Sequence, residues 1–459
     1  MSNTSLFTDF DPVSAKAFKQ KIQMDLQGAD YNEELVWSSP EGVHVKPFYH
    51  RDSFEPLGPI PGHPEHWNIG ESFFILNEKI ANKVALENLE RGTESLFFIA
   101  EKAFDIEKLL IDIPEKTPLY FQCSFRDELF IKDFQSFIQE HKYPVYLLHD
   151  PIGNLVSTGN WNHSRSKDLE EISYWSDQSE MKSAFTIRMD QYADAGANAV
   201  QQLAYGLAHA TEYLNVLYSR GAKAEANPLL SFQVACGGNY FFEIAKLRAL
   251  RLLYQSVAKE FQLREDLHLI ATPAKRNKSI YDYNTNMIRT TTEYMSAALG
   301  GADVILTQAY DSLYHKTNEF GQRIARNQLL ILREESYLDA VKNPADGTYY
   351  IEAMTHELIQ KTLPIYKAIE KAGGLIDRLH AGEIQRKIKE EAEKEQKRFD
   401  IGQKVLIGSN KHKNPQDRMK QELELYPFLK KRNTKTLIEP IIQRRLSEAL
   451  EQERLAQES

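Results

Sequence analysis

The 459-residue sequence has few cysteines, no long apolar run and no excess of positive charge. Its two cysteines, Cys123 and Cys236, both lie in apolar segments typical of strands. This placement predicts buried reduced thiols rather than a disulfide or a metal site, and such thiols are typical of a reducing compartment. No apolar run approaches the roughly 20 residues that span a bilayer, and the polar N-terminus has no signal-peptide core. A cytoplasmic protein with no membrane segment is therefore expected.

The net charge of -9 argues against a general nucleic-acid-binding protein, which usually carries a basic surface. The sequence also has no Walker loop, no dinucleotide-binding fingerprint and no metalloprotease motif. Three histidines, His50, His63 and His66, lie close together in a Pro- and Gly-rich segment. Because no cysteine or closely spaced carboxylate pair completes a ligand set, exposed loop histidines are the preferred interpretation over a metal site.

What the sequence does contain is strand–loop–helix units. An apolar run at Ala184–Met189 leads into a small-residue loop, Ala193–Asn198, and then a long amphipathic helix. A second run, Leu229–Ala235, leads into a Gly-rich loop, Gly237–Asn239, and a helix that begins near Tyr240. Such units predict a parallel sheet covered by helices, with chemistry at the carboxyl ends of the strands.

The same alternation continues through the central part of the chain. The predicted strands are Leu96–Ile99, Leu119–Gln122, Val145–Leu148, Phe185–Arg188, Leu229–Ala235, Leu267–Ala271 and Val304–Thr307, with a weaker candidate at Thr348–Ile351. Seven or eight such units in roughly 300 residues favour an α/β fold of the (β/α)8, or TIM barrel, type, and a doubly wound sheet is the alternative.

Segments of different composition flank the barrel. Residues 1–50 read as an N-terminal helical arm with an extended lead-in, residues 51–400 as the barrel, and residues 401–459 as a helical C-terminal tail. The arm is expected either to dock on a partner or to fold back on its own domain. The charged run Glu383–Asp400 is interpreted as a solvated helix face.

Some polar residues in the predicted loops and helices could carry chemistry. Asp190 and Asp194 follow a strand, where barrel enzymes place acids, although for Asp194 capping of the next helix is preferred. The backbone of Gly237-Gly238-Asn239 could receive a phosphate at a helix N-terminus, and a tight turn explains these glycines equally well.

Five basic residues lie on two of the predicted helices. Lys246, Arg248 and Arg251 are expected to be surface charges or interface contacts. Arg323 and Arg326 lie at a helix start, where positive charge is unfavourable, so each is expected to have an anionic partner.

Several blocks together resemble the coenzyme-B12-dependent methylmalonyl-CoA mutase family. They occur in family order over roughly residues 36–415 and include AGANAVQQLAYGLAHATEYL, FFEIAKLRALRLL, MIRTTTEYMSAALGGAD, RIARNQLLILREES and NPADGTYYIEAMTHEL. The resemblance implies a (β/α)8 barrel that, in catalytic members, threads the CoA thioester along its axis. A separate flavodoxin-like domain then caps the barrel with cobalamin.

At the positions that the family uses for catalysis, this sequence differs. Asp190 and Gln191 stand where catalytic members carry a Tyr-His pair that contacts substrate. Gly70-Glu71-Ser72 replaces an Arg-Gln-Tyr segment, whose Tyr packs against cobalamin, so Ser72 is a second altered position. Thr307 replaces a histidine, and Pro273–Ser279 replaces a Thr-Ser-Gly substrate loop. The helix at Arg444–Ala456 resembles the one that precedes the cobalamin domain, but no Asp-x-His-x-x-Gly motif follows it.

The resemblance therefore implies the small, or beta, subunit of a heterodimeric methylmalonyl-CoA mutase. On this hypothesis the chain has no catalytic residue (Asp190, Gln191, Ser72 and Thr307 being degenerate positions) and binds no cofactor or metal. Adenosylcobalamin and the chemistry reside in the large, or alpha, chain. One alternative is the barrel of a split acyl-CoA mutase with a separate B12-binding polypeptide. Another is a repurposed barrel that binds a CoA ester or a regulatory partner.

Overall fold

The computed structural model describes residues 10–125, 127–176, 181–221, 229–430 and 434–458. Eight parallel strands close into a barrel in the order β10-β3-β4-β5-β6-β7-β8-β9. They are β3 (Asn68–Phe74), β4 (Ser95–Ala100), β5 (Leu119–Cys123), β6 (Val145–Leu147), β7 (Ser183–Arg188), β8 (Leu229–Cys236), β9 (Leu267–Pro273) and β10 (Val304–Leu306). The chain therefore adopts the expected TIM-barrel fold and not a doubly wound sheet.

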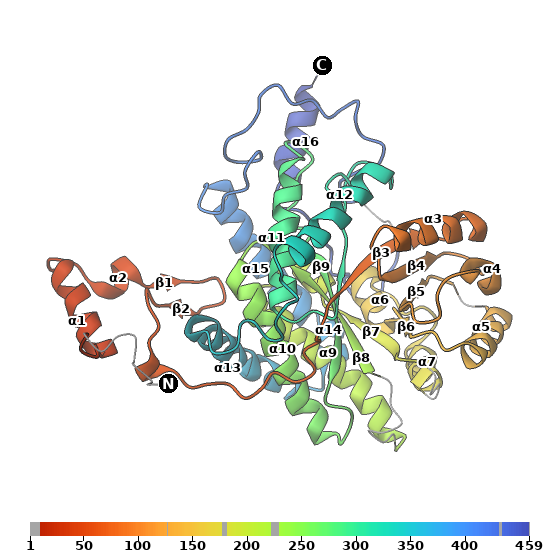
Figure 1. Ribbon diagram of the computed structural model, residues 1–459, viewed down its shortest axis with the longest axis horizontal. Helices are drawn as coiled ribbons and strands as arrows, with labels where there is room; N and C mark the ends of the chain where they lie inside the picture. Colours follow the sequence, from red (N-terminus) through yellow and green to blue (C-terminus); the bar gives the residue numbers. More distant parts are fainter. Residues whose placement is uncertain (1–9, 126, 177–180, 222–228, 431–433, 459) are drawn as a thin grey trace, which may run out of the picture.

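Helices surround the barrel (Figure 1). Those of the barrel's first half are α3 (Glu78–Glu90), α4 (Ile106–Leu110), α5 (Glu128–Glu140), α6 (Pro151–Thr158) and α7 (Arg165–Ser176). The second half carries α8 (Asp190–Asp194), α9 (Ala199–Ser219), α10 (Tyr240–Glu260), α11 (Thr285–Leu299) and α12 (Glu319–Leu330). Then follow α13 (Tyr349–Lys371), α14 (Leu375–His380), α15 (Glu383–Asp400) and α16 (Glu448–Gln457). Among the described residues, no helix is long and apolar enough to cross a bilayer.

Seven strands lie where the sequence predicts them, but the eighth does not. Thr348–Ile351 is wrong as a strand, because Thr348 precedes α13 and the following residues are helical. The missing strand is β3, whose sequence NIGESFF has too many polar residues to resemble a buried strand. Glu71 in this strand is buried because Arg326 of α12 binds both its carboxylate oxygens, at 2.9 and 3.0 Å. A pairing across 255 residues cannot be read from local sequence.

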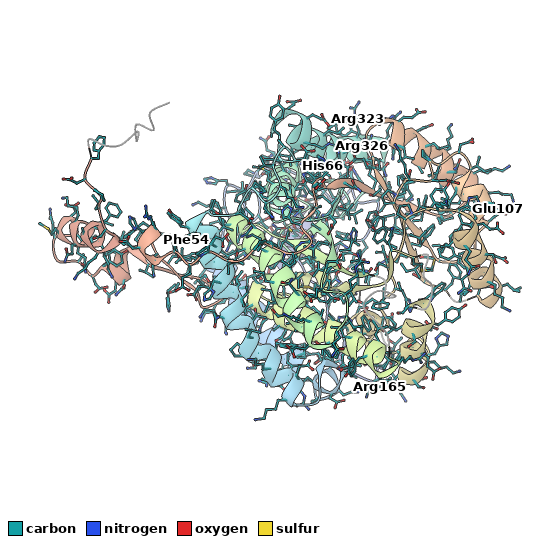
Figure 2. All side chains as sticks on the ribbon, turned by 60° about the horizontal axis from the view of Figure 1, so that its bottom comes forward. Phe54, His66, Glu107, Arg165, Arg323 and Arg326 are labelled. Atoms are coloured by element: carbon teal, nitrogen blue, oxygen red, sulfur yellow. The ribbon has the colours of Figure 1, made fainter. Side chains whose placement is uncertain are left out.

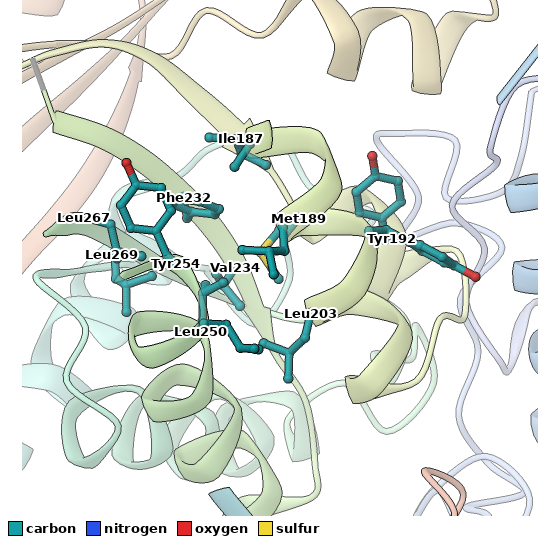
Figure 3. Close-up of a cluster of buried hydrophobic side chains, with 14 of the residues drawn as sticks. Ile187, Met189, Tyr192, Leu203, Phe232, Val234, Leu250, Tyr254, Leu267 and Leu269 are labelled. Carbon is teal, nitrogen blue, oxygen red and sulfur yellow. The ribbon is translucent and has the colours of Figure 1, made fainter. Parts of the chain in front are cut away.

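The main core lies between the strands and the helices α9 and α10. Outward-facing residues of β7, β8 and β9, such as Ile187, Phe232 and Leu269, meet Leu203 of α9 and Leu250 of α10 (Figure 3). Each of these side chains is completely buried. Burying one side chain of this size stabilises the folded state by about 1.5–3 kcal/mol. The packing of α9 and α10 on the strands therefore holds the loops at the strand ends in place.

Helix α9 is fixed at its start by its own sequence. Asn198 accepts a hydrogen bond from the Gln201 backbone N–H, and the Gln201 side chain accepts one from the Asn198 N–H, which forms a capping box. Further along, Gly206 lets the helix approach β7, since a Cβ there would lie 2.4 Å from the Met189 sulfur. The loop between β7 and α9 is therefore held at both ends.

The N-terminal arm extends away from the barrel (Figure 1). It contains α1 (Ala15–Asp25), α2 (Tyr31–Leu35) and a two-stranded hairpin of β1 (Trp37–Ser38) and β2 (His44–Val45). No residue of α1 is buried. The helix contacts the lead-in through the Phe18–Phe48 rings 4.8 Å apart and the Ala15 N–H bonded to Asp52. The hairpin packs on the barrel, because the rings of Trp37 and Phe242 of α10 lie 5.8 Å apart, whereas α1 leaves an exposed apolar surface.

Candidate functional site

A cavity of about 840 Å³ opens where the carboxyl ends of the barrel strands meet, and we call it the mouth cavity. One side is formed by strand ends and the loops after them, and the other by tail residues 425–430 and 443–445. Ser72, Asp190 and Thr307 all line it, although they come from distant parts of the sequence. Gln191 is buried beside it, and its side-chain oxygen has no hydrogen-bond partner among the described residues. The fold thus gathers three of the four altered positions at one cavity.

Asp190 holds an arginine at the wall of this cavity. Its two carboxylate oxygens accept hydrogen bonds from Arg188 Nε and Nη2 at 2.8 and 2.7 Å. Burial disfavours the charged guanidinium, but the charge and hydrogen bonds of Asp190 raise the pKa of Arg188 above its ordinary value. Asp190 is therefore neutralised by a bidentate pair and is not a free general base. Asp190 could be singled out from the sequence, whereas Arg188, at the end of β7, carried no sequence signal of a site.

Asp194 does not cap the following helix, so that interpretation is wrong. Asn198 caps α9, and Asp194 instead accepts hydrogen bonds from the backbone N–H groups of Lys275 and Arg276, at 2.7 and 3.2 Å. Burial raises the pKa of Asp194, while the Lys275 charge and the two N–H donors oppose this. The carboxylate therefore joins the β7 loop to the loop after β9.

A set of uncharged polar side chains forms a layer within the mouth cavity. This polar layer comes from five different strands or strand ends and consists of Ser72, Gln122, Gln233, Thr272 and Thr307. Ser72, Gln122, Gln233 and Thr272 alternate with outward-facing neighbours on their strands, whereas Thr307 follows the end of β10 and reaches the cavity from the loop. Two of them are the altered positions Ser72 and Thr307, and the other three were not singled out from the sequence.

Aromatic rings fill the barrel axis beneath the polar layer. Phe97, Tyr120 and Tyr146 are register partners on β4, β5 and β6, and their rings stack at centroid distances of 4.0 and 4.5 Å. His268 of β9 completes this aromatic ladder, because its ring lies 4.5 Å from Tyr146 and its Nε2 lies 2.9 Å from the Tyr120 hydroxyl. Phe97 also lines the mouth cavity, so the ladder forms the floor. Aromatic residues in adjacent predicted strands were the sequence signal for this feature.

The loop after β9 is tied down by buried ion pairs. Lys278 contacts both carboxylate oxygens of Glu293, at 2.9 and 2.8 Å, and both side chains are almost fully buried. Burial lowers the pKa of Lys278 and raises that of Glu293, and each partner opposes the shift of the other. Arg276 pairs with Glu395 of α15 at 2.5 Å. The segment that stands in place of a substrate loop is thus fixed to the tail side of the molecule.

The loop Gly237-Gly238-Asn239 borders a small cavity. Glu41 and Glu243 line this cavity together with three basic residues, Arg276, Arg398 and Lys404. Burial raises the pKa of Glu41, and the neighbouring charge of Glu243 raises it further.

The basic residues of α10 are not surface charges. Lys246, Arg248 and Arg251 are each about 1% exposed, and each forms an ion pair with an acid. Arg251, for example, binds Asp303 at 2.8 Å beneath the barrel. Because α10 packs on the strands, the charged ends of these side chains lie between the helix and neighbouring segments. Their hydrophilic character alone therefore did not predict whether they are exposed.

The two arginines of α12 have different environments. Arg326 has the expected anionic partner, Glu71. Arg323 forms no ion pair with a described residue and instead lies over the Phe320 ring at 5.5 Å. Both lie on α12 (Figure 2).

Metal binding finds no support in the described residues. No group of three or more His, Cys, Asp or Glu side chains is arranged to hold an ion. Of the three loop histidines, His66 is exposed as expected, but His63 is buried at 8%, and burial lowers its pKa. Cys123 and Cys236 are free thiols, as predicted, and burial raises the pKa of Cys123 to about 12.

Comparison with known proteins gives a consistent set of relatives. The family model described as methylmalonyl-CoA mutase matches residues 146–456. The chain is 30% identical to the methylmalonyl-CoA mutase small subunit of Porphyromonas gingivalis, over 89% of this chain and 71% of that protein. It is 28% identical to the small subunit of Streptomyces virginiae, over 79% of this chain and 63% of that protein. It is also 34% identical to the P. gingivalis large subunit, over 49% of this chain and 32% of that protein.

Proposed function

The chain belongs to the methylmalonyl-CoA mutase family, and we propose that it is the small, non-catalytic subunit of a heterodimeric, adenosylcobalamin-dependent mutase. The complex would interconvert methylmalonyl-CoA and succinyl-CoA in the cytoplasm. The large chain would hold the substrate, the cofactor and all catalytic groups. This chain would support the fold of that partner and would be inactive alone.

The aromatic ladder carries this proposal. Catalytic members of the family are expected to thread the CoA thioester along the barrel axis, and here that axis holds Phe97, Tyr120 and Tyr146. Phe97 and Tyr120 are each 1% exposed, so these two rings are packed against their neighbours and line no open channel. Opening a channel would require removal of well-packed rings, at a cost of several kcal/mol. Substrate threading is therefore disfavoured by packing and not only by the loss of polar groups.

The altered mouth supports the same assignment. Asp190, in place of a substrate-contacting residue, is occupied by Arg188, and Ser72 and Thr307 offer only small hydroxyls. Tail residues 425–430 and 443–445 cover the face on which a cobalamin ring would have to stack. The residues present do not fit the cofactor, so we assign adenosylcobalamin to the large chain and derive no step through it.

The existence of a large partner is supported by the relatives. Both a small and a large subunit carry the mutase name in P. gingivalis, and this chain resembles both. The N-terminal arm is the proposed contact with the partner, because α1 buries nothing in its own chain. Exposed apolar residues on the arm include Phe10 at 74% and Met24 at 75%. Apolar side chains on a projecting helix are typical of a surface that is covered in a complex.

Separate and joint expression of the two chains tests the proposal. This chain, the large chain from the same cell and the co-expressed pair are each given methylmalonyl-CoA and adenosylcobalamin. We expect turnover by the pair and none by this chain alone. Turnover by this chain alone would refute the proposal, and turnover after addition of a small free-standing B12-binding protein would favour the split-mutase alternative.

A further inference from the structure

The polar layer of the mouth cavity has hydrogen-bonding capacity that the protein does not use. None of its side chains (Ser72, Gln122, Gln233, Thr272 and Thr307) hydrogen-bonds to another described residue. None of their polar atoms is among the fully enclosed ones, so all of them face accessible space. Gln233 is buried and the other four residues are half-buried, so their donors and acceptors are presented to the cavity. A layer of unpaired amides and hydroxyls on five strands therefore has the composition of a binding surface.

The charges around the cavity are unbalanced in one direction. Of the acids that line it, Asp190 pairs with Arg188 and Glu448 pairs with Arg444, whereas Asp194 and Asp311 accept hydrogen bonds from neutral donors. Three lysines at the rim form no ion pair with a described residue, namely Lys275, Lys316 and Lys430. Three lysines thus face two carboxylates, Asp194 and Asp311, that have no Lys or Arg ion pair, and the balance is one positive charge, although the whole chain carries a net charge of -9. A positive rim favours an anionic ligand.

Arg188 adds a charged donor deeper in the same cavity. Asp190 fixes its Nε and Nη2, whereas Nη1 has no hydrogen-bond partner and is not fully enclosed. Only 19% of this side chain is exposed, so the guanidinium is held in place rather than solvated. A preorganised arginine of this kind recognises carboxylates well.

The closed floor limits the size of the ligand. Phe97 and the rest of the aromatic ladder seal the axis below, so a ligand must enter from the tail side. A cavity of about 840 Å³ lies in the range of pockets that hold small molecules.

We propose that the mouth cavity binds a small hydroxycarboxylate with two carboxylate groups. The carboxylates meet Arg188 and the rim lysines, and the hydroxyl meets the amides and hydroxyls of the polar layer. This site does not depend on the role of the chain as a mutase subunit, because it is built from residues of this chain alone. The mouth cavity would then bind a ligand although it carries no catalytic residues.

Calorimetric titration of the full chain with malate tests the proposal. Matched probes are 1,2,4-butanetriol, which keeps the hydroxyl but has no charge, and inorganic phosphate. We expect saturable binding of one malate, no binding of the triol, and phosphate at least about tenfold weaker than malate. Lys275→Gln should weaken malate binding by about threefold, as expected for the loss of an exposed ion pair. The triple variant Lys275→Gln/Lys316→Gln/Lys430→Gln should weaken it by about 20-fold. Gln233→Leu, which removes the one buried amide of the polar layer, should weaken malate binding by about tenfold.

The control is Lys259→Gln, which removes an exposed lysine from the last turn of α10, outside the cavity. It should leave malate binding unchanged. No saturable binding at about 10 mM malate, equal binding of the triol, or an equal loss in the control would each overturn the proposal. Tight binding of phosphate would overturn the carboxylate assignment. Because the lysine variants are on the surface and binding is measured without a partner, the result is separate from the test of subunit function.

Discussion

The hydroxyl of Tyr120 and the Nε2 atom of His268 lie 2.9 Å apart inside the barrel, on strands from opposite parts of the chain. This contact joins β5 to β9 across the axis. Burial lowers the pKa of His268, so the neutral imidazole is favoured there. Its Nε2 can then accept a hydrogen bond from the Tyr120 hydroxyl. A barrel centre closed by stacked rings and one hydrogen bond is a packed core.

Truncating Tyr120 should therefore cost stability. Tyr120→Ala is expected to lower the free energy of unfolding by about 3–5 kcal/mol, because it removes a fully buried ring between two others. Tyr120→Phe keeps the packing but leaves His268 without its partner, and should cost about 1 kcal/mol. Urea unfolding measures both. Tyr218→Phe on α9, where the side chain is exposed, is the matched control, and a cost for Tyr120→Ala no greater than that control would contradict a packed barrel centre.

The buried Lys278–Glu293 pair gives a second prediction. Glu293→Gln should destabilise the protein by about 3–5 kcal/mol, because it leaves a buried ammonium without a counter-charge. The double variant Lys278→Met/Glu293→Leu should recover most of this loss, since it removes both charges. Thermal and denaturant unfolding of the two variants decide the matter. Equal destabilisation by both would mean that the loop after β9 needs the ion pair itself rather than charge balance.

The acids Glu370 of α13 and Glu212 of α9 should make stability depend on pH. Burial and the Glu212 charge raise the pKa of Glu370 to about 7, from 4.5. The folded state then binds more protons than the unfolded state between these values, so stability falls as pH rises from 4.5 to 7. Because Glu370 is only about half buried, we expect an effect of about 1 kcal/mol.

Replacement of Glu370 by Gln should remove this dependence. Glu370→Gln is expected to be more stable than the parent above pH 7 by about 1 kcal/mol, and no more stable below pH 4.5. Unfolding midpoints across this pH range measure it. Glu357→Gln, an exposed position on the same helix, should leave the profile unchanged. A stability difference between parent and Glu370→Gln that stays constant between pH 4.5 and 7 would mean that the pKa of Glu370 is not raised.

The N-terminal arm provides a test that separates stability from assembly. Met24→Glu should leave the unfolding midpoint of the isolated chain unchanged, because the side chain is 75% exposed. It should weaken association with the large chain by about tenfold or more, since a charge would be buried at the interface. Analytical ultracentrifugation measures the association, and Lys16→Ala on the same helix is the control. Unchanged association would place the partner surface elsewhere.

The sequence by itself determined the repeating part of this protein. Apolar runs followed by amphipathic helices predicted seven of the eight strands, because buried parallel strands such as β8 need continuous apolar residues. Local polar signals were less informative. They predicted the partner of Arg326 but placed Lys246, Arg248 and Arg251 on the surface, where none of them lies.

Tertiary structure alone decided β3, the aromatic ladder and the mouth cavity. Two residues of β3 fit the barrel through distant contacts. The Phe97 ring fills the space beside Gly70, which has no side chain, and Arg326 neutralises the buried Glu71. The resemblance to the mutase family singled out Ser72, Asp190 and Thr307, but barrel closure brought them together with Gln122 and Gln233. Such contacts depend on strand order and register over long separations, and no local pattern in the sequence encodes them.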